Sequence, residues 1–323
     1  MKINKKFRSL FMAFALGTAL MTTVSSCSKD DDAPVVVSNT ITDKVVADAS
    51  FSILEKAVIK AGLDGTLKGA GPFTVFAPDD AAFAASGITS ATIDALTAND
   101  LKAILLYHTI GSKILAADVP AGPNAKVVTA GGDSVFVTKN ASGVYVNGIK
   151  VTAADIAADN GVIHKIGRVL NPPAGNIVET AVAAGLDSLV KAVTVATNAP
   201  GGDPTLAGTL SSAKLTVFAP TNQAFTDVLA ALSLTDINQI PIGTLLAVLR
   251  YHVVGGRAFS SDLANGNLGM LAGGNTTINL TNGTGGGPTI LGNGNGSNKS
   301  NIVATNVVCR NGVVHLIDRV LLP

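Results

Sequence analysis

Apolar residues between positions 45 and 170 recur at two different periods. From residue 45 to residue 61 they return at the spacing of one face of an amphipathic helix. A run at residues 73–77 stops at Pro78 and predicts a strand, because proline has no backbone N–H to continue a ladder. Residues 90–107 are again helical in spacing. Short alternating runs then predict strands at residues 126–129, 134–138, 143–146, 150–153 and 162–170. Helices ahead of antiparallel strands indicate the α+β class.

The same succession of patterns occurs twice. Its landmarks are Thr-Val-Phe-Ala-Pro from Thr74 and Thr216, Tyr-His from Tyr107 and Tyr251, and Asn-Gly-Val-x-His from Asn160 and Asn311. The distance between matching landmarks grows from 135 residues (51 against 186) to 151 residues (160 against 311), which predicts loop insertions near residues 199–204 and 282–298. A proline-containing hinge at residues 171–175 separates the copies. We therefore predict two domains, at residues 39–173 and 174–323.

Local signals refine this picture in both copies. Asp79 and Thr221 are expected helix N-caps, because their side-chain oxygens can accept a hydrogen bond from an unpaired backbone N–H. The two Asn-Gly pairs predict type I′ hairpin turns, since both residue types tolerate positive φ. In the strand after the first pair, His164 shares a face with the apolar Val162 and Ile166. We expect the same of His315 in the second copy.

These landmarks, taken together, resemble those of the fasciclin (FAS1) family. The resemblance covers both copies and nearly all of the chain after residue 38. It implies two tandem FAS1 domains, each an antiparallel β-wedge packed with helices, and a role in adhesion or extracellular-matrix contact without catalysis. In animal members an Asp-Ile dipeptide is associated with receptor binding, and the matching positions here read Asp-Val and Asp-Leu. The resemblance therefore implies these interaction candidates: Tyr107, His108, Asp118, Tyr251, His252 and Asp262.

The N-terminal segment predicts export and a lipid anchor. A basic start, an apolar run at residues 10–21 and small residues up to Cys27 have the form of a lipoprotein signal peptide, residues 1–27. The apolar run is shorter than the roughly 20 residues that cross a bilayer. Residues 28–38 form an acidic tether that resembles the export signal of bacterial surface lipoproteins. We expect acylation of Cys27 and an outward-facing place on the outer membrane.

Composition narrows the classes of partner. The formal net charge is +1, so there is no basic surplus for nucleic acid, and we expect no nucleic-acid partner. Trp is absent and Tyr occurs three times, which weakens the hypothesis of a sugar-binding cleft built on aromatic stacking. The leading hypothesis is a surface protein that binds another surface or matrix protein. A glycan-binding accessory lipoprotein of a polysaccharide-uptake system is the alternative. With Cys27 acylated, Cys309 would have no disulfide partner.

All four histidines are repeat landmarks, and two interpretations of them compete. They could ligate metal in pairs, His108 with His164 and His252 with His315, or they could hold the fold together. Asp80 in the first copy is replaced by Asn222 in the second, and an amide is a poor substitute for a carboxylate at a metal. We therefore predict structural hydrogen bonds between His108 and Asp80 and between His252 and Asn222. We expect no metal, no cofactor and no catalytic residue, since a Gly-x-Ser-x-Gly elbow is also missing.

Overall fold

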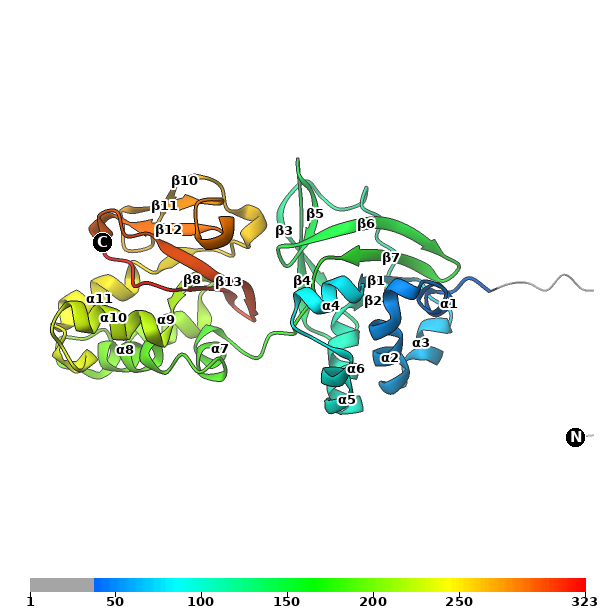
Figure 1. Ribbon diagram of the computed structural model, residues 1–323, viewed down its shortest axis with the longest axis horizontal. Helices are drawn as coiled ribbons and strands as arrows, with labels where there is room; N and C mark the ends of the chain where they lie inside the picture. Colours follow the sequence, from blue (N-terminus) through cyan, green and yellow to red (C-terminus); the bar gives the residue numbers. More distant parts are fainter. Residues whose placement is uncertain (1–37) are drawn as a thin grey trace, which may run out of the picture. The chain divides into compact units, whose positions relative to one another are not determined.

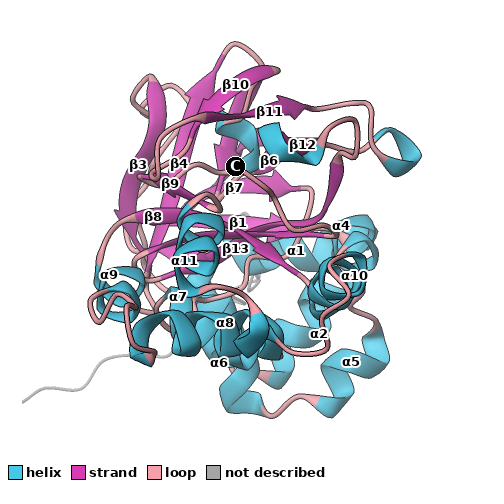
Figure 2. Ribbon diagram, turned by 90° about the vertical axis from the view of Figure 1, so that its left-hand side faces the viewer, coloured by secondary structure: helices cyan, strands magenta, loops and turns pink. Residues whose placement is uncertain are grey.

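The computed structural model describes residues 38–323, which form one compact unit. The predicted signal peptide, Cys27 and residues 28–37 of the tether lie outside the described residues. Within residues 38–323 the chain builds two α+β modules in succession, and each has a seven-stranded sheet. In each module the helices gather on one side of the strands (Figures 1 and 2). The predicted fold class is confirmed.

The first module contains short helices and a mixed sheet. Its helices are α1 (Ile41–Ala47), η1 (Ala49–Phe51), α2 (Ser52–Lys60), α3 (Asp64–Lys68), α4 (Asp80–Ala85), α5 (Ser90–Ala95) and α6 (Ala98–Tyr107). Its strands are β1 (Phe73–Pro78), β2 (Thr109–Ile110), β3 (Gly122–Val128), β4 (Ser134–Asn140), β5 (Gly143–Val146), β6 (Ile149–Ala158) and β7 (Gly161–Ile166). They lie in the order β2-β1-β7-β6-β5-β4-β3. Neighbours are antiparallel except β1 and β7, which run parallel.

The second module repeats this topology. Its helices are α7 (Ile177–Ala183), α8 (Asp187–Asn198), α9 (Leu206–Ser212), α10 (Asn222–Ala231), η2 (Ile237–Gln239), α11 (Ile242–Arg250), η3 (Ser260–Asp262), η4 (Thr284–Gly286) and η5 (Asn293–Asn295). Its strands are β8 (Leu215–Pro220), β9 (Val253–Gly255), β10 (Gly266–Gly269), β11 (Asn275–Asn279), β12 (Thr289–Gly292), β13 (Ser300–Cys309) and β14 (Gly312–Ile317). The order β10-β11-β12-β13-β14-β8-β9 is that of the first sheet written in reverse, and β14 and β8 are its parallel pair.

The helix boundaries follow from their caps. Asp79 accepts a hydrogen bond from the backbone N–H of Ala82, and Thr221 accepts one from Ala224, so both predicted N-caps are confirmed. The predicted single helix at residues 90–107 is wrong, because the structure divides it into α5 and α6. Thr97 caps α6 in a reciprocal pair with Asp100, and this pair starts a new helix where the spacing alone suggested continuity.

The prediction of type I′ turns at the Asn-Gly pairs is also wrong, although β6 and β7 do form a hairpin. Neither Asn160 nor Gly161 has a positive φ. Gly161 lies inside β7 against β1, where a Cβ would stand 2.1 Å from the carbonyl oxygen of Phe73. The Asn160 side chain instead accepts from the N–H of Ile41 and donates to the carbonyls of Leu67 and Gly69. Asn311 makes the equivalent three bonds in the second module. Each Asn therefore fastens two helices to the sheet.

Two buried apolar clusters fill each module. One lies between helices and sheet, around Leu54 in the first module and around Leu189 in the second. The other is enclosed by the strands, around Phe76 in the first module and Phe218 in the second. Tyr107 and Tyr251 belong to the strand-enclosed clusters, which places the Tyr-His landmarks inside the protein.

Candidate interaction loops

The Tyr-His pairs are buried parts of the scaffold. Tyr107 and Tyr251 are each 1% exposed, and His108 and His252 are each 2% exposed. The Tyr107 hydroxyl donates to the carbonyl of Ser134 and accepts from the Asn147 amide, while burial raises its pKa to about 12. The prediction that these residues form an interaction patch is therefore wrong, because a partner cannot reach side chains that close the core.

His108 and His252 are held by backbone groups. The N–H of Leu170 donates to Nε2 of His108 at 2.9 Å, so the ring proton is on Nδ1, which donates to the carbonyl of Ile104. His252 has the same arrangement: its Nε2 accepts from Leu321, and its Nδ1 lies 2.7 Å from the Val248 carbonyl. Burial lowers the pKa of each imidazole to about 4, so both are neutral at pH 7.

The predicted bonds from these histidines to Asp80 and Asn222 are wrong. Asp80 accepts from the hydroxyl of Ser52 and the N–H of Ile53 at the start of α2. Asn222 accepts from the N–H of Ser188 and donates to Gly185. Both side chains follow an N-cap directly, so they meet the unpaired amides of the neighbouring helix start. In contrast, His108 is the C-cap of α6, and His252 directly follows the C-cap of α11.

The other two histidines hold a pair of equivalent surface loops. We call residues 112–121 the first interaction loop and residues 256–265 the second interaction loop; each follows the Tyr-His landmark. His164 Nε2 donates to the carbonyl of Ile114 at 2.9 Å, and its Nδ1 accepts from the N–H of Asp155. His315 Nε2 donates to Ala258 at 2.9 Å in the second module. Burial lowers the pKa of His315 to about 4. The expectation that both rings point into the apolar interior is confirmed, since His164 is 5% and His315 is 0% exposed.

Asp155 and Asn306 also hold these loops, and sequence reasoning missed them. Both lie at register shifts between β6 and β7 or between β13 and β14, with φ of 60° and 65°. The Asp155 carboxylate accepts from the N–H of Ala116 at 2.9 Å, and the Asn306 carbonyl oxygen accepts from Ser260 at 2.8 Å. Among residues other than glycine, Asp and Asn best tolerate this backbone conformation. Their equal spacing, nine residues before His164 and His315, was the available signal.

Asp118 and Asp262 occupy equivalent positions but differ in access. Each carboxylate closes its own loop by accepting a backbone N–H, from Leu115 in the first loop and from Phe259 in the second. Asp118 is exposed. Asp262 also accepts from the side chains of Asn124 and Thr138 in the first module, at 3.1 and 3.2 Å. The first interaction loop is therefore open to a partner, whereas the carboxylate of the second is already engaged.

The remaining candidate chemistry is limited. Within residues 38–323 no group of three or more His, Cys, Asp or Glu side chains could hold a metal ion. Cys309 is buried, and burial raises the pKa of its thiol, which works against a reactive thiolate. Among the helices of the described part, none combines the length and apolarity needed to cross a bilayer.

Comparison with known proteins gives a consistent family assignment. A model of the Fasciclin domain matches residues 49–172 and 189–323. Protein sll1483 of Synechocystis is 38% identical over 169 residues, which are 50% of this chain and 91% of that protein. The transforming growth factor-beta-induced protein ig-h3 of Sus scrofa is 39% identical over 135 residues, 42% of this chain but only 20% of its own length.

The structure of a FAS1 domain pair from the insect cell adhesion molecule fasciclin I matches with a TM-score of 0.40 and 18% sequence identity. The match covers 87% of this chain and 96% of the insect chain.

Proposed function

Because this chain belongs to the fasciclin domain family, we propose that it is a non-enzymatic surface lipoprotein that binds another surface or matrix protein through its first interaction loop. Fasciclin domains in related proteins are linked to cell adhesion or protein interaction. The proposal adds a location, an anchor and a specific contact surface to that general role. Its anchor is the lipid expected on Cys27, and its location is the outer face of the outer membrane.

The accessibility and rigidity of the first interaction loop support this function most directly. His164 and Asp155 form hydrogen bonds with the backbone of Ile114 and Ala116, while Asp118 remains exposed. Lys139 donates to the carbonyl of Ala116 at 3.0 Å and adds a further restraint. A loop held in one conformation loses little conformational entropy on binding, so its contacts contribute more fully to affinity.

Charge reversal within the loop tests the contact surface. Lys113 is exposed in the loop and Lys102 is exposed on α6, and neither side chain has a partner among the described residues. We expect Lys113→Glu to reduce attachment of protein-coated beads to neighbouring cells or matrix at least fivefold, with Lys102→Glu unchanged. Equal attachment by wild type and Lys113→Glu would remove the loop from the binding surface.

The location has its own test. Cys27→Ala is expected to abolish incorporation of labelled fatty acid and to release the protein from the membrane fraction. Protease added to intact cells should degrade the wild-type protein if it faces outward. Full protection from protease in intact cells, with degradation after lysis, would place it on the inner side of the outer membrane.

A polar pocket favours acidic glycan as the second candidate partner. It has a volume of about 580 Å³, and its lining carries four cationic side chains, Lys126, Lys214, Arg257 and Arg310, against one carboxylate, Asp133. Lys126 and Lys214 are exposed and have no partner among the described residues, so their charges are available to an anion. Sulfated or carboxylated oligosaccharides should bind, and Lys126→Gln with Lys214→Gln should abolish that binding. Absence of binding to acidic oligosaccharides at low salt would exclude this candidate.

A further inference from the structure

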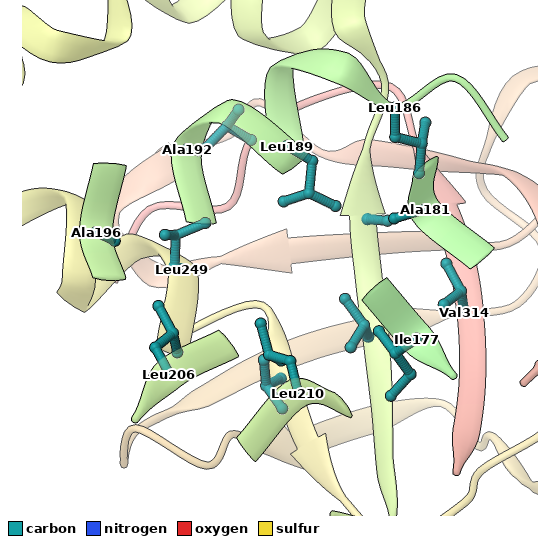
Figure 3. Close-up of a cluster of buried hydrophobic side chains, with 14 of the residues drawn as sticks. Ile177, Ala181, Leu186, Leu189, Ala192, Ala196, Leu206, Leu210, Leu249 and Val314 are labelled. Carbon is teal, nitrogen blue, oxygen red and sulfur yellow. The ribbon is translucent and has the colours of Figure 1, made fainter. Parts of the chain in front are cut away.

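The helical layer of the second module contains an apolar cavity of about 270 Å³. Aliphatic side chains from α7, α8 and α9 form most of its lining, including Val178, Ala181, Val190, Val193, Leu206 and Leu210. Figure 3 shows the buried part of this wall, where Leu189, Leu206, Leu210 and Leu249 converge from α8, α9 and α11. Val178, Val190 and Val193 are only partly buried, so the cavity opens to solvent beside them.

The first module shows how this fold closes the same space. Ile41 and Ile177 occupy equivalent positions, since the N–H of each donates to the Asn of the Asn-Gly landmark. Four residues after each isoleucine, the first module has Val45, which is 5% exposed, and the second has Ala181. The loss of two methyl groups at this position leaves space that a larger side chain fills in the first module.

A hydrogen bond that links two helices in the first module is also lost in the second. In the first module the hydroxyl of Thr42 on α1 donates to the carbonyl of Asp64 at the start of α3, at 3.0 Å. Val178 takes the place of Thr42 in the second module, and Ala207 takes the place of Asp64. Both side chains line the cavity. The exchange removes the hydroxyl that would fasten these helices together and adds apolar surface that faces the open space.

An insertion borders the cavity in the second module. Leu206 and Leu210 match Leu63 and Leu67, but residues 197–204, which form the end of α8 and the loop before α9, have no counterpart in the first module. The inserted segment is held firmly, because Asp203 accepts from Arg250 at 2.8 Å and its own N–H donates to the carbonyl of Ala196. The inserted segment is therefore attached to both α8 and α11.

The chemistry of the lining selects the ligand. The cavity wall contains no Asp, Glu, Lys or Arg and no Phe, Tyr or Trp, and its polar groups near the exposed end are those of Thr194, Thr197 and Asn198. Both hydroxyls donate to their own helix, which leaves their oxygens as acceptors, and the Asn198 amide has no partner among the described residues. His252, deeper in the wall, has both ring nitrogens occupied by backbone. A carboxylate or phosphate would find no cation here, whereas alcohol hydroxyls would find hydrogen-bond partners.

We propose that this cavity binds a neutral single-chain acyl ester, a monoacylglycerol in chemical class, with the acyl chain between α7, α8 and α9 and the glycerol hydroxyls at Thr194, Thr197 and Asn198. The cavity volume of about 270 Å³ is far above the roughly 10–15 Å³ that one water-sized group requires, so the cavity has room for an acyl chain. Binding would remove from water the apolar surface that the missing side chains leave uncovered. This site is independent of the first interaction loop and of the function proposed above.

The test uses residues 38–323, which comprise the whole compact unit. Calorimetry and native mass spectrometry with 1-decanoylglycerol, below its aggregation concentration, should show one bound molecule per chain. Sodium decanoate should bind at least tenfold more weakly, because its carboxylate has no partner. Binding of decanoate as tight as that of the ester would overturn the assignment of a neutral head group.

Two valines of α7 provide a matched pair of variants. Val178 lines the cavity, whereas Val182, one turn further along α7, is 57% exposed and lies outside the lining. Val178→Phe is expected to weaken binding of 1-decanoylglycerol at least tenfold, and Val182→Phe to leave it within twofold of wild type. Circular dichroism of both variants checks that they fold. Undiminished binding by folded Val178→Phe, several molecules bound per chain, or no binding to wild type would each overturn the proposal.

Discussion

The two modules share their sheets and differ in their helical layers. Strand order, the parallel pair and the hydrogen bonds of each histidine Nε2 are the same in both. In the layer formed by α1, α2 and α3 the buried Val45 occupies the position of Ala181, whereas the layer formed by α7, α8 and α9 contains the cavity. The difference shows that the landmarks of this fold specify the sheet and the ends of its helices, while the packing of the outer helices is free to change.

The same comparison separates the two interaction loops. Both are held by a buried histidine and by an Asp or Asn of left-handed backbone conformation. In the second loop, Asp262 accepts a hydrogen bond from Asn124 of the first module. Arg257 of the same loop stacks on Phe136, with its guanidinium carbon 3.8 Å from the ring centroid. Equivalent scaffolds thus present one loop to solvent and use the other internally. The two differences together place one candidate binding feature in each module.

The largest expected effect tests the equivalence of the two sheets. Gly161→Ala and Gly312→Ala should each destabilise the protein by about 4 kcal/mol or more, because either Cβ would lie 2.1 Å from a carbonyl oxygen of the parallel neighbour strand. Urea denaturation gives the free energy of unfolding. Hydrogen exchange should show that the loss of amide protection is confined to the module that carries the substitution. A loss of less than 1 kcal/mol in either variant would mean that this strand pairing is not as close as described.

The second effect concerns the neutral histidines and depends on pH. The pKa of His252 is lowered to about 4 in the folded protein, against 6.5 in the unfolded chain. The unfolded chain therefore binds a proton first as pH falls, so stability is full above pH 6.5 and declines toward pH 4. The decline is roughly 3 kcal/mol for one such imidazole.

His252→Gln is expected to lower stability at pH 7 but to flatten its pH dependence between 6.5 and 4 by the equivalent of about one proton. His108→Gln should do the same in the first module, since the pKa of His108 is lowered to about 4 by the same burial. Denaturation curves at several pH values supply the measurement. If either variant keeps the wild-type slope, its imidazole does not titrate in this way.

Much of this architecture could be predicted from the sequence, for physical reasons. Strands can be predicted from alternating apolar and polar residues, and helix caps from local side-chain chemistry. Both signals occur again in the second copy of the repeat. The bonding partners of His108 were missed because the atoms it meets, at Ile104 and Leu170, are backbone groups that every residue carries. The role of Gly161 was missed because contact with a parallel strand far along the chain leaves no local pattern.

The candidate sites were less predictable than the fold. The Tyr-His pairs stand out in the sequence because the core requires them, and burial rules them out as a contact surface. Asp155 carries no cue in its immediate neighbours, since a left-handed residue inside a strand is visible only in three dimensions. The cavity was signalled by the insertion at residues 197–204, but its apolar lining depends on which helix faces pack together.

The third prediction exchanges the residues that distinguish the helical layers. Val45→Ala should cost about 2 kcal/mol, because it removes two buried methyl groups from a closed core. Ala181→Val should change stability by less than about 1 kcal/mol, since the added methyl groups enter existing space. Thermal and urea unfolding measure both. A loss of more than about 1 kcal/mol in Ala181→Val would show that the second layer is packed as tightly as the first.

The smallest expected effect tests whether the two loops are truly held alike. Asp155→Asn gives the first module the residue that the second has at Asn306, with an acceptor oxygen for the N–H of Ala116 and tolerance of the φ of 60°. Stability should change by less than about 0.5 kcal/mol. Asp155→Ala lacks the acceptor and should cost about 1 to 2 kcal/mol. Hydrogen exchange of the Ala116 amide reports the same contrast, with faster exchange in Asp155→Ala alone. Faster exchange in Asp155→Asn would show that the first loop requires the carboxylate charge, and that the two modules hold their loops by different means.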